Sequence, residues 1–197
     1  MKSPLIDNFY RLFDVIKPNR ICEVGTHDGK SATQMCLYLL QMGLEVDYTG
    51  YDLFEDADEQ THKIGKNGKG TGRLGIASAK LRTLREKYPT KFNYRLIQGD
   101  STVTLNTPQK YDFAFIDGGH NYEIVKHDFE MLKETPVIVF DDYNISLVAK
   151  AVDELDNVYQ IDTKCKRNKR KQAIRLHDTS LVNQFAEGVI KWVYPNT

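Results

Sequence analysis

The stretch RICEVGTHDGKS, residues 20–31, decides the fold. It begins as a short apolar run that ends in Gly25, which is typical of a buried strand followed by a tight turn. Apolar residues from Ala32 to Leu40 then recur at helical spacing, and Gly43 closes that helix. The stretch therefore predicts a strand, a glycine turn and a helix in direct succession.

This succession repeats along the chain. Further strands are predicted at Val46–Asp52, Phe92–Gln98, Tyr111–Ile116 and Val137–Phe140, and helices at Ala77–Tyr88, Tyr122–Lys133 and Ile145–Leu155. Strands that alternate with helices through short connections indicate an α/β domain with a mainly parallel sheet. Two more strand-like runs, Val158–Lys164 and Gln172–His177, would add an antiparallel hairpin at one edge. A closing helix is predicted within Ser180–Trp192.

A chain of 197 residues is long enough for one domain and short for two. We expect a single domain over residues 1–197, with an N-terminal helix in 1–18, a flexible glycine- and lysine-rich loop at 60–76 and the hairpin at 158–178. Lys and Arg together number 27, as do Asp and Glu, so the formal net charge is zero. This balance excludes a globally basic binder of nucleic acid or membranes and leaves only a local basic patch open.

The cysteines and the N-terminus bear on localisation. Cys22, Cys36 and Cys165 show neither zinc-finger nor CxxC spacing, which favours a reduced setting. No apolar run reaches the length of a membrane span, and the first ten residues lack the basic and apolar regions of a signal peptide. We therefore expect a cytoplasmic protein that does not engage a membrane.

Ligands of parallel α/β sheets bind outside the carboxyl ends of the strands, so the residues after each strand are the candidates for a site. Gly25 and Gly29 allow a tight turn, and the helix amides that follow suit a polar or anionic group. Their spacing, Glu-x-Gly-x-x-x-Gly, matches neither the dinucleotide fingerprint nor the phosphate loop. A plain strand–helix turn is the alternative interpretation.

Acidic residues follow the next two strands. The separation in sequence between Gly29 and Asp52 suits an acid that accepts hydrogen bonds from ribose hydroxyls. Aspartate is also common in ordinary turns, which is the alternative. Asp100 and Ser101 follow the third strand. They are placed to contact an adenine amine and ring, or else to cap the next helix.

Three aspartates follow the fourth and fifth strands. Asp117 follows one strand, and Asp141 and Asp142 follow a second strand that we expect to be its neighbour. Like charges at this density need protons or a cation, and oxygen ligands suit Mg²⁺ or Ca²⁺. His120 stands beside them and could act as a general base near neutral pH. The alternative is a set of helix caps and loop acids.

Two further segments contain clusters of positively charged side chains. The Ile64–Gly75 loop interleaves glycines with lysines and an arginine, and it is either a substrate lid or a solvated connection. The Lys164–Lys171 run could touch nucleic acid, but no aromatic residue interleaves it. A solvated hairpin tip is therefore the favoured interpretation of that run.

Taken together, the strand-end motifs resemble the class I S-adenosylmethionine-dependent methyltransferases, from about Asn19 to Asp178. The segment Phe115–Tyr122, with Asp128 downstream, is similar to the subgroup of macrocin O-methyltransferase-like and cephalosporin hydroxylase-like proteins. The resemblance implies a single Rossmann-like, doubly wound mixed sheet of seven strands, with an antiparallel C-terminal hairpin and helices on both faces. It also implies divalent-metal-assisted O-methylation of a small hydroxylated substrate, of sugar or natural-product type.

By this resemblance each candidate residue receives a role. The residues that would bind S-adenosylmethionine are Glu23, Gly25, Thr26, Gly29, Ser31, Asp52, Leu53, Asp100, Ser101 and Asp117. Asp117, Asp141 and Asp142 would hold Mg²⁺ or another divalent cation, and His120 and Asp117 would be catalytic. The chain is near the minimal length for this fold, so loops or a partner subunit in a homo-oligomer would have to complete the acceptor site.

Three other functions stay open. A methyltransferase acting on nucleic acid would use the Lys164–Lys171 run. A non-catalytic module that binds a nucleotide or a metal could share the fold, since fold alone does not determine function. A nicotinamide enzyme is disfavoured by the glycine spacing.

Overall fold

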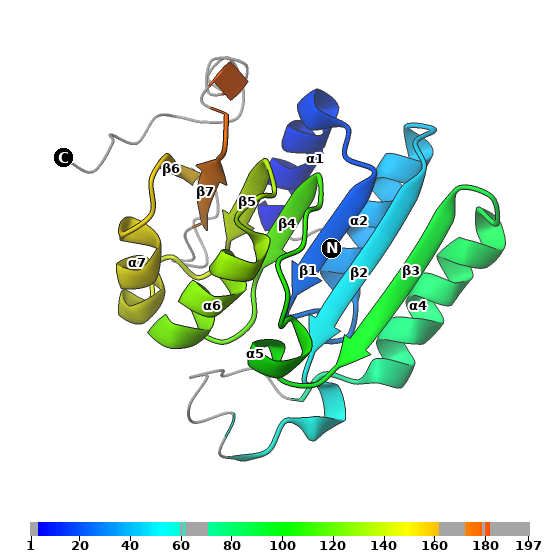
Figure 1. The fold of residues 1–197 in the computed structure, drawn as a ribbon. Coiled ribbons are helices and arrows are strands. Elements are labelled where there is room, and N and C mark those ends of the chain that lie inside the picture. Colours follow the sequence, from blue (N-terminus) through cyan, green and yellow to red (C-terminus); the bar gives the residue numbers. More distant parts are fainter. Residues whose placement is uncertain (1–3, 60, 62–70, 162–171, 179, 182–197) are drawn as a thin grey trace.

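A computed structural model of the chain describes residues 4–59, 61, 71–161, 172–178 and 180–181. Its centre is a seven-stranded sheet with the order β3-β2-β1-β4-β5-β7-β6 (Figure 1). The strands are β1 (Arg20–Val24), β2 (Val46–Asp52), β3 (Phe92–Gln98), β4 (Phe113–Ile116), β5 (Val137–Phe140), β6 (Val158–Ile161) and β7 (Gln172–Leu176). The pairs among β1 to β5 are parallel, and β7 pairs antiparallel with both β5 and β6. The predicted mixed sheet and antiparallel C-terminal strands are confirmed.

Helices lie on both faces of the sheet (Figure 1). The helical elements are α1 (Pro4–Ile16), α2 (Lys30–Gln41), the 3₁₀ turn η1 (Phe54–Asp56), α4 (Leu74–Lys87), α5 (Ser101–Thr104), α6 (Tyr122–Leu132) and α7 (Ser146–Asp153). Helices α1, α2 and α4 pack on one face, and α5, α6 and α7 on the other. Within the described ranges, no helix combines the length and the hydropathy that crossing a membrane would require.

The strands separate two hydrophobic cores because alternate side chains point to opposite faces. In β4, Phe113 and Phe115 join the core beneath α1, where Phe9 packs edge-on against both rings. Ala114 and Ile116 join the core beneath α6 and α7. All four of these strand residues are buried, as expected for a parallel strand covered on both faces.

The boundaries differ from the predictions in two informative places. Strand β4 begins at Phe113 rather than Tyr111, because the Tyr111 N–H donates to the Thr135 hydroxyl (3.2 Å) and not to a neighbouring strand. Helix α4 begins at Leu74, inside the segment predicted as a loop. The predicted closing helix beyond Leu181, the Lys164–Lys171 run and residues 62–70 of the predicted loop lie outside the described residues.

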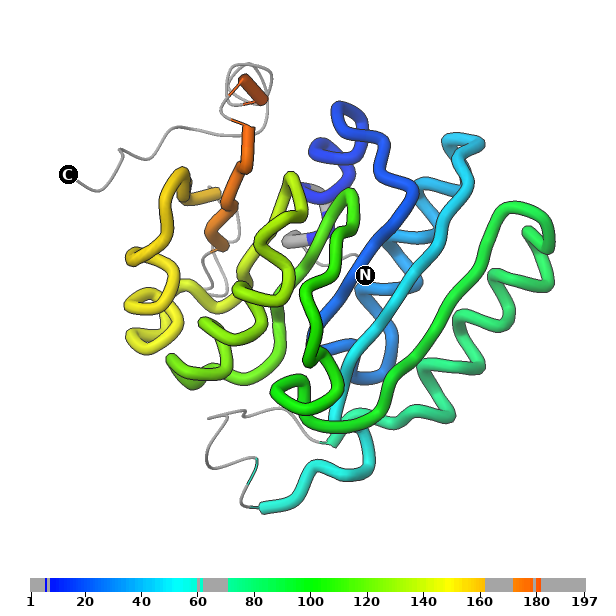
Figure 2. Tube along the Cα trace, viewed as in Figure 1, coloured from blue at the N-terminus to red at the C-terminus, as the bar shows by residue number. Residues whose placement is uncertain are grey.

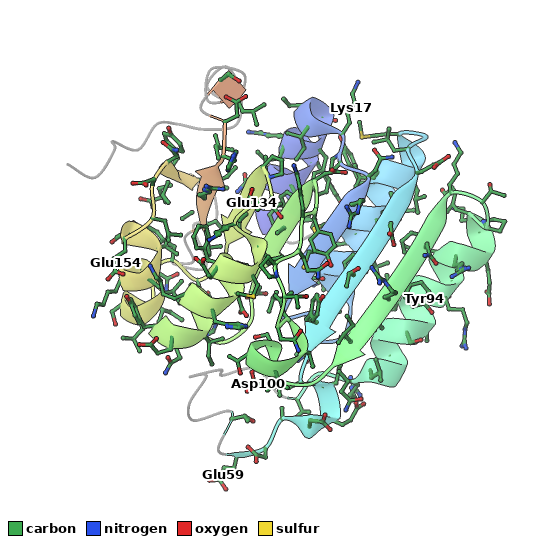
Figure 3. The ribbon with its side chains drawn as sticks, in the orientation of Figure 1. Lys17, Glu59, Tyr94, Asp100, Glu134 and Glu154 are labelled. Carbon is green, nitrogen blue, oxygen red and sulfur yellow. The ribbon has the colours of Figure 1, made fainter. Side chains whose placement is uncertain are left out.

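The sheet brings the candidate residues to one edge. Val24 of β1 is in register with Tyr51 of β2 and with Ile116 of β4, and Ile116 is in register with Phe140 of β5. The segments that follow these strands therefore leave the sheet at the same end. Figure 2 shows this end at the bottom of the view, where the chain after β2 and β3 turns outward. In Figure 3, Asp100 lies at this lower end and Lys17 at the opposite one.

Candidate active site at the carboxyl ends of the strands

The turn after β1 packs directly against the turn after β4. Gly25 adopts a left-handed backbone (φ 95°), and a β-carbon there would lie 2.2 Å from the carbonyl oxygen of Asp117. The Gly25 N–H donates to the carbonyl of Tyr51 at the end of β2 (2.8 Å). Only glycine fits both the φ angle and the close approach of the Asp117 carbonyl. The ends of β1, β2 and β4 therefore meet at a residue without a side chain.

Beneath this turn, Glu23 is completely buried in a hydrogen-bonded group. The Ser31 hydroxyl donates to its Oε1, and the Tyr48 hydroxyl donates to its Oε2 (2.5 Å). The Thr26 hydroxyl lies 3.1 Å from the Tyr48 oxygen. Burial raises the pKa of Glu23 to about 8 against the lowering effect of these two donors. These side chains therefore bond to one another and support the turn from below.

Asp52 joins the turns after β1 and β2. Its carboxylate accepts the His27 N–H (2.8 Å) and the Phe54 N–H (2.6 Å). These bonds hold the carboxylate at the rim of the β1 turn, in the position where the sequence predicts a ribose acid. Leu53 follows it, half-buried, as the residue preceding the 3₁₀ turn η1.

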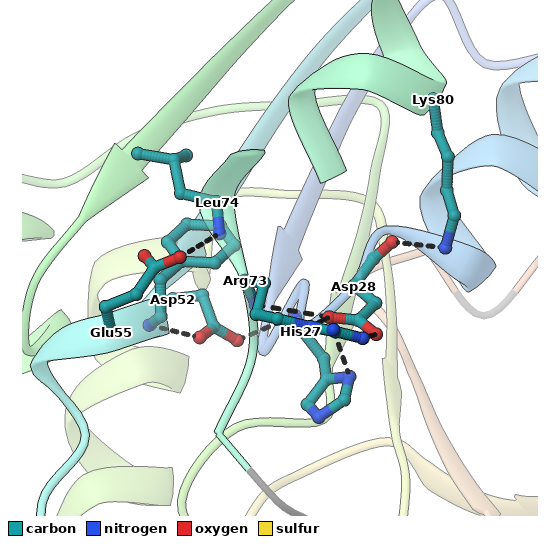
Figure 4. Close-up of polar contacts among 8 residues, drawn as sticks. His27, Asp28, Asp52, Glu55, Arg73, Leu74 and Lys80 are labelled. Atoms are coloured by element: carbon teal, nitrogen blue, oxygen red, sulfur yellow. Dashed lines mark hydrogen bonds and ion pairs between the residues drawn. The ribbon is translucent and has the colours of Figure 1, made fainter. Parts of the chain in front are cut away.

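The segment leading into α4 is fastened to the same rim (Figure 4). The Arg73 guanidinium pairs with the Asp28 carboxylate (3.0 Å), and this pairing lowers the pKa of Asp28. The Leu74 N–H donates to Glu55, and Lys80 donates to the Asp28 carbonyl (2.7 Å). Sequence reasoning placed a mobile loop up to Gly75 and missed this attachment, because an exposed ion pair between distant loops has no sequence signature.

Asp100 and Ser101 form the start of α5. The Asp100 Oδ1 accepts both the backbone N–H and the hydroxyl of Thr102, each at 2.8 Å. Asp100 is therefore the N-cap of the short helix, which is one of the two roles that the sequence predicted for it. This role leaves the exposed carboxylate at the strand-end edge, where a ligand can reach it.

Asp117, His120 and Asp142 are brought together at the ends of β4 and β5. One ligand atom from each lies within 4.8 Å of the others. The His120 Nε2 lies 3.0 Å from the Asp142 Oδ2, and both side chains are buried. Asp142 has a left-handed backbone (φ 50°), which is uncommon for residues other than glycine. Asp141 is also buried but does not belong to the group.

The donors of this cluster fit a divalent cation. Two carboxylates and one imidazole are groups that metal ions bind in proteins, and the burial of His120 and Asp142 favours a counter-charge. The sequence predicted Asp117, Asp141 and Asp142 as the ligands and His120 as a base. The structure places His120 next to Asp142 in this cluster, and its role as a base stays a prediction. The assignment of Asp141 as a ligand stays a prediction.

Comparisons with known proteins agree with this geometry. A family model described as a methyltransferase domain matches residues 22–143. None of the curated proteins compared with the chain matches it.

Among solved structures, the O-methyltransferase TomG of Streptomyces achromogenes, in complex with SAM, has a TM-score of 0.60 at 13% identity, over 89% of this chain and 81% of TomG. An O-methyltransferase from Bacillus cereus in complex with SAH has a TM-score of 0.57 at 15% identity, over 89% and 82% of the two chains. Cofactor-bound Rv0187 from MTB has a TM-score of 0.61 at 16% identity, over 89% and 81%.

The family match spans more than half of the chain and includes the β1 turn, Asp52, Asp100 and the Asp117–Asp142 cluster. The solved structures above cover about nine-tenths of this chain, including its seven-stranded sheet, with TM-scores of 0.57 to 0.61. The chain therefore belongs to the methyltransferase-domain family and has the fold of the class I S-adenosylmethionine-dependent methyltransferases.

Proposed function

We propose that the protein transfers the methyl group of S-adenosylmethionine to a hydroxyl oxygen of a small molecule, with the help of a divalent cation. The observation that carries this proposal is the contact between Gly25 and Asp117. It places the turn expected to bind the cofactor against the cluster expected to bind the metal. The cofactor's methyl group and the acceptor hydroxyl would then lie on either side of the contact between Gly25 and Asp117.

The cofactor would lie along the strand ends. Its methionine part would occupy the Gly25–Gly29 turn, its ribose would bond to Asp52, and its adenine would face Asp100 and Ser101. Asp52 already holds backbone N–H groups through both oxygens, so its carboxylate is oriented before the ribose arrives. The solved structures with SAM and SAH at similar folds support this cofactor assignment.

Asp117 and Asp142 would hold the cation, with Asp141 as a further predicted ligand. A bound divalent cation would lower the pKa of the acceptor hydroxyl and orient it toward the methyl group. His120 accepts the hydroxyl proton, and the Asp142 carboxylate stabilises the resulting imidazolium through Nε2. When bound, S-adenosylmethionine would supply the methyl group to the acceptor oxygen, and S-adenosylhomocysteine would be the other product.

The acceptor is proposed to be small because TomG, which has a similar fold, is an O-methyltransferase involved in tomaymycin synthesis. Nucleic acid is not favoured as the acceptor, since no aromatic residue interleaves the Lys164–Lys171 run on which that alternative rests. Within the described chain, Cys22 and Cys36 are buried free thiols, which agrees with the reduced cytoplasmic setting that we infer.

The test measures release of S-adenosylhomocysteine from a panel of hydroxylated small molecules, with Mg²⁺ or with a chelator. Turnover should require the cation and should fall by about 10²-fold or more in Asp117→Asn and His120→Ala. Mn²⁺ binding followed by electron paramagnetic resonance should be lost in Asp117→Asn. Glu134→Gln, at an exposed position outside the cluster, is the matched control. Full turnover of Asp117→Asn in chelator would refute the metal-assisted mechanism.

A further inference from the structure

Helix α5 is too short to be stable by itself. It has four residues, Ser101–Thr104, whereas isolated helices need about 12 or more to persist in water. Yet it carries Asp100 and Ser101, the residues expected to face the adenine. Its position must therefore be set by contacts with the rest of the fold, and the element packed against it is α6.

Helix α6 contacts both ends of α5 through two consecutive residues. His127 donates from Nε2 to the carbonyl of Leu105, the C-terminal cap of α5 (3.0 Å). Asp128 is fully buried and lies beside Ser101, the first residue of α5. The Gln109 N–H also donates to the Met131 carbonyl of α6 (2.7 Å), so the chain after α5 follows the same helix.

Asp128 is a costly residue to bury. Burial raises its pKa to about 7, and the Ser101 hydroxyl lies near enough to lower it in part. Within ordinary hydrogen-bond limits neither carboxylate oxygen has a partner among the described residues. One of these oxygens would lie 3.8 Å from a β-carbon placed on Gly118, next to the predicted metal ligand Asp117. A buried acid with so little compensation calls for a reason other than the stability of the fold.

We infer that Asp128, with His127, is a positioning residue that fixes the adenine-reading turn Asp100–Ser101 and so determines the selectivity for the purine base. This inference rests on the proposed function. Asp128 acts through Ser101 at the start of α5, and His127 acts through Leu105 at its end. Because α6 begins directly after the cluster that contains Asp117 and His120, one helix aligns the cofactor base with the methyl-transfer site.

The test compares the affinities of S-adenosylhomocysteine and S-inosylhomocysteine by isothermal titration. Inosine replaces the amine donor of adenine by a carbonyl, so the ratio of the two dissociation constants reports on adenine reading. The wild type should prefer the adenosyl compound. Asp128→Leu removes the polar side chain beside Ser101 and should lower that preference by about tenfold. Asp128→Asn, which keeps a polar side chain of the same size there, should keep the preference within about threefold.

Two controls separate positioning from a general structural role. Asp128→Leu removes a poorly compensated buried acid, so it should fold, and its thermal midpoint is measured beside the affinities. Glu130→Gln, at an exposed position of α6, should leave both affinities unchanged. His127→Phe removes the bond to the Leu105 carbonyl and should lower the preference as Asp128→Leu does.

The outcomes are distinguishable. If the wild type binds neither compound, the proposed function fails and the inference fails with it. If the wild type prefers the adenosyl compound and Asp128→Leu retains that preference, the inference alone is overturned. An equal weakening of both compounds in Asp128→Leu would also overturn it, because a positioning residue for adenine must change the ratio.

Discussion

Replacing Glu23 by glutamine should remove a large part of the pH dependence of the free energy of unfolding. The folded protein holds the Glu23 proton up to a pKa of about 8, whereas the ordinary glutamic acid of an unfolded chain releases it at 4.5. Between these values the folded state binds more protons than the unfolded state. Stability from this group is therefore complete below the unfolded pKa and falls as the pH rises toward 8.

The magnitude follows from the linkage relation. Each pH unit in this window costs about 1.4 kcal/mol, so the wild type should lose about 3 kcal/mol between about pH 5.5 and 7.5 through Glu23. Glu23→Gln does not titrate, so the loss should be absent. The stability of the variant minus that of the wild type should rise by the same amount across the window.

The hydrogen bonds of the site allow this substitution. A glutamine amide can donate to the Tyr48 oxygen, and Tyr48 can in turn donate to Thr26, since either hydroxyl of that pair can be the donor. The Ser31 hydroxyl can still donate to the amide oxygen. The variant should therefore fold with the group satisfied, as the protonated acid is in the wild type.

Urea unfolding at a series of pH values measures the effect, and the slope with urea reports whether the unfolded state has changed. The difference between the two proteins removes the contributions of other titrating groups. Parallel curves for wild type and variant across this window would refute the reasoning that Glu23 is protonated in the folded protein.

Three further predictions use the same unfolding and binding assays. Gly25→Ala should lower the free energy of unfolding by about 3 kcal/mol and abolish S-adenosylhomocysteine binding. The control is Gly75→Ala in α4, where a β-carbon meets nothing within 4 Å, and it should stabilise the protein by about 0.5–1 kcal/mol. Tyr48→Phe removes a donor from the buried group and should destabilise by about 2 kcal/mol in urea, while Tyr38→Phe at an exposed bond should cost clearly less. Asp142→Asn should weaken Mn²⁺ binding in calorimetry, and an unchanged affinity would remove Asp142 from the metal site.

Much of the fold could be predicted because its strands carry recognisable hydrophobic patterns. Strands β2, β3 and β5 occupy the predicted residues. β5 is a continuous apolar run, whereas β3 begins with apolar and polar residues in alternation, as a strand with one exposed face does. The 3₁₀ turn η1 was not predicted, and helix α5 was predicted only as a helix, without bounds, that Asp100 or Ser101 would cap. Four or three residues contain too little periodicity to detect, and tertiary contacts such as His127 to Leu105 stabilise them.

The candidate site was predicted as a set of strand-end residues, but not as a set of bonds. The rule that ligands bind at carboxyl ends of strands located Asp52, Asp100 and Asp117 without a structure. It could not reveal that Glu23 bonds to Tyr48, because these residues lie on different strands and meet only through the sheet register. The approach of His120 to Asp142 likewise joins residues that follow two different strands, β4 and β5, and it could not be read from the sequence.

In the proposed function, the Gly25 turn and the Asp117–His120–Asp142 cluster form adjoining sites for the cofactor and a metal. Isothermal titration of the wild type with S-adenosylhomocysteine, in Mg²⁺ and in chelator, measures both sites at once. The expected dissociation constant is on the order of micromolar, with tighter binding when Mg²⁺ is present. Absence of binding by the folded protein in both conditions would contradict the cofactor site, and identical binding in both would contradict the coupling to a metal.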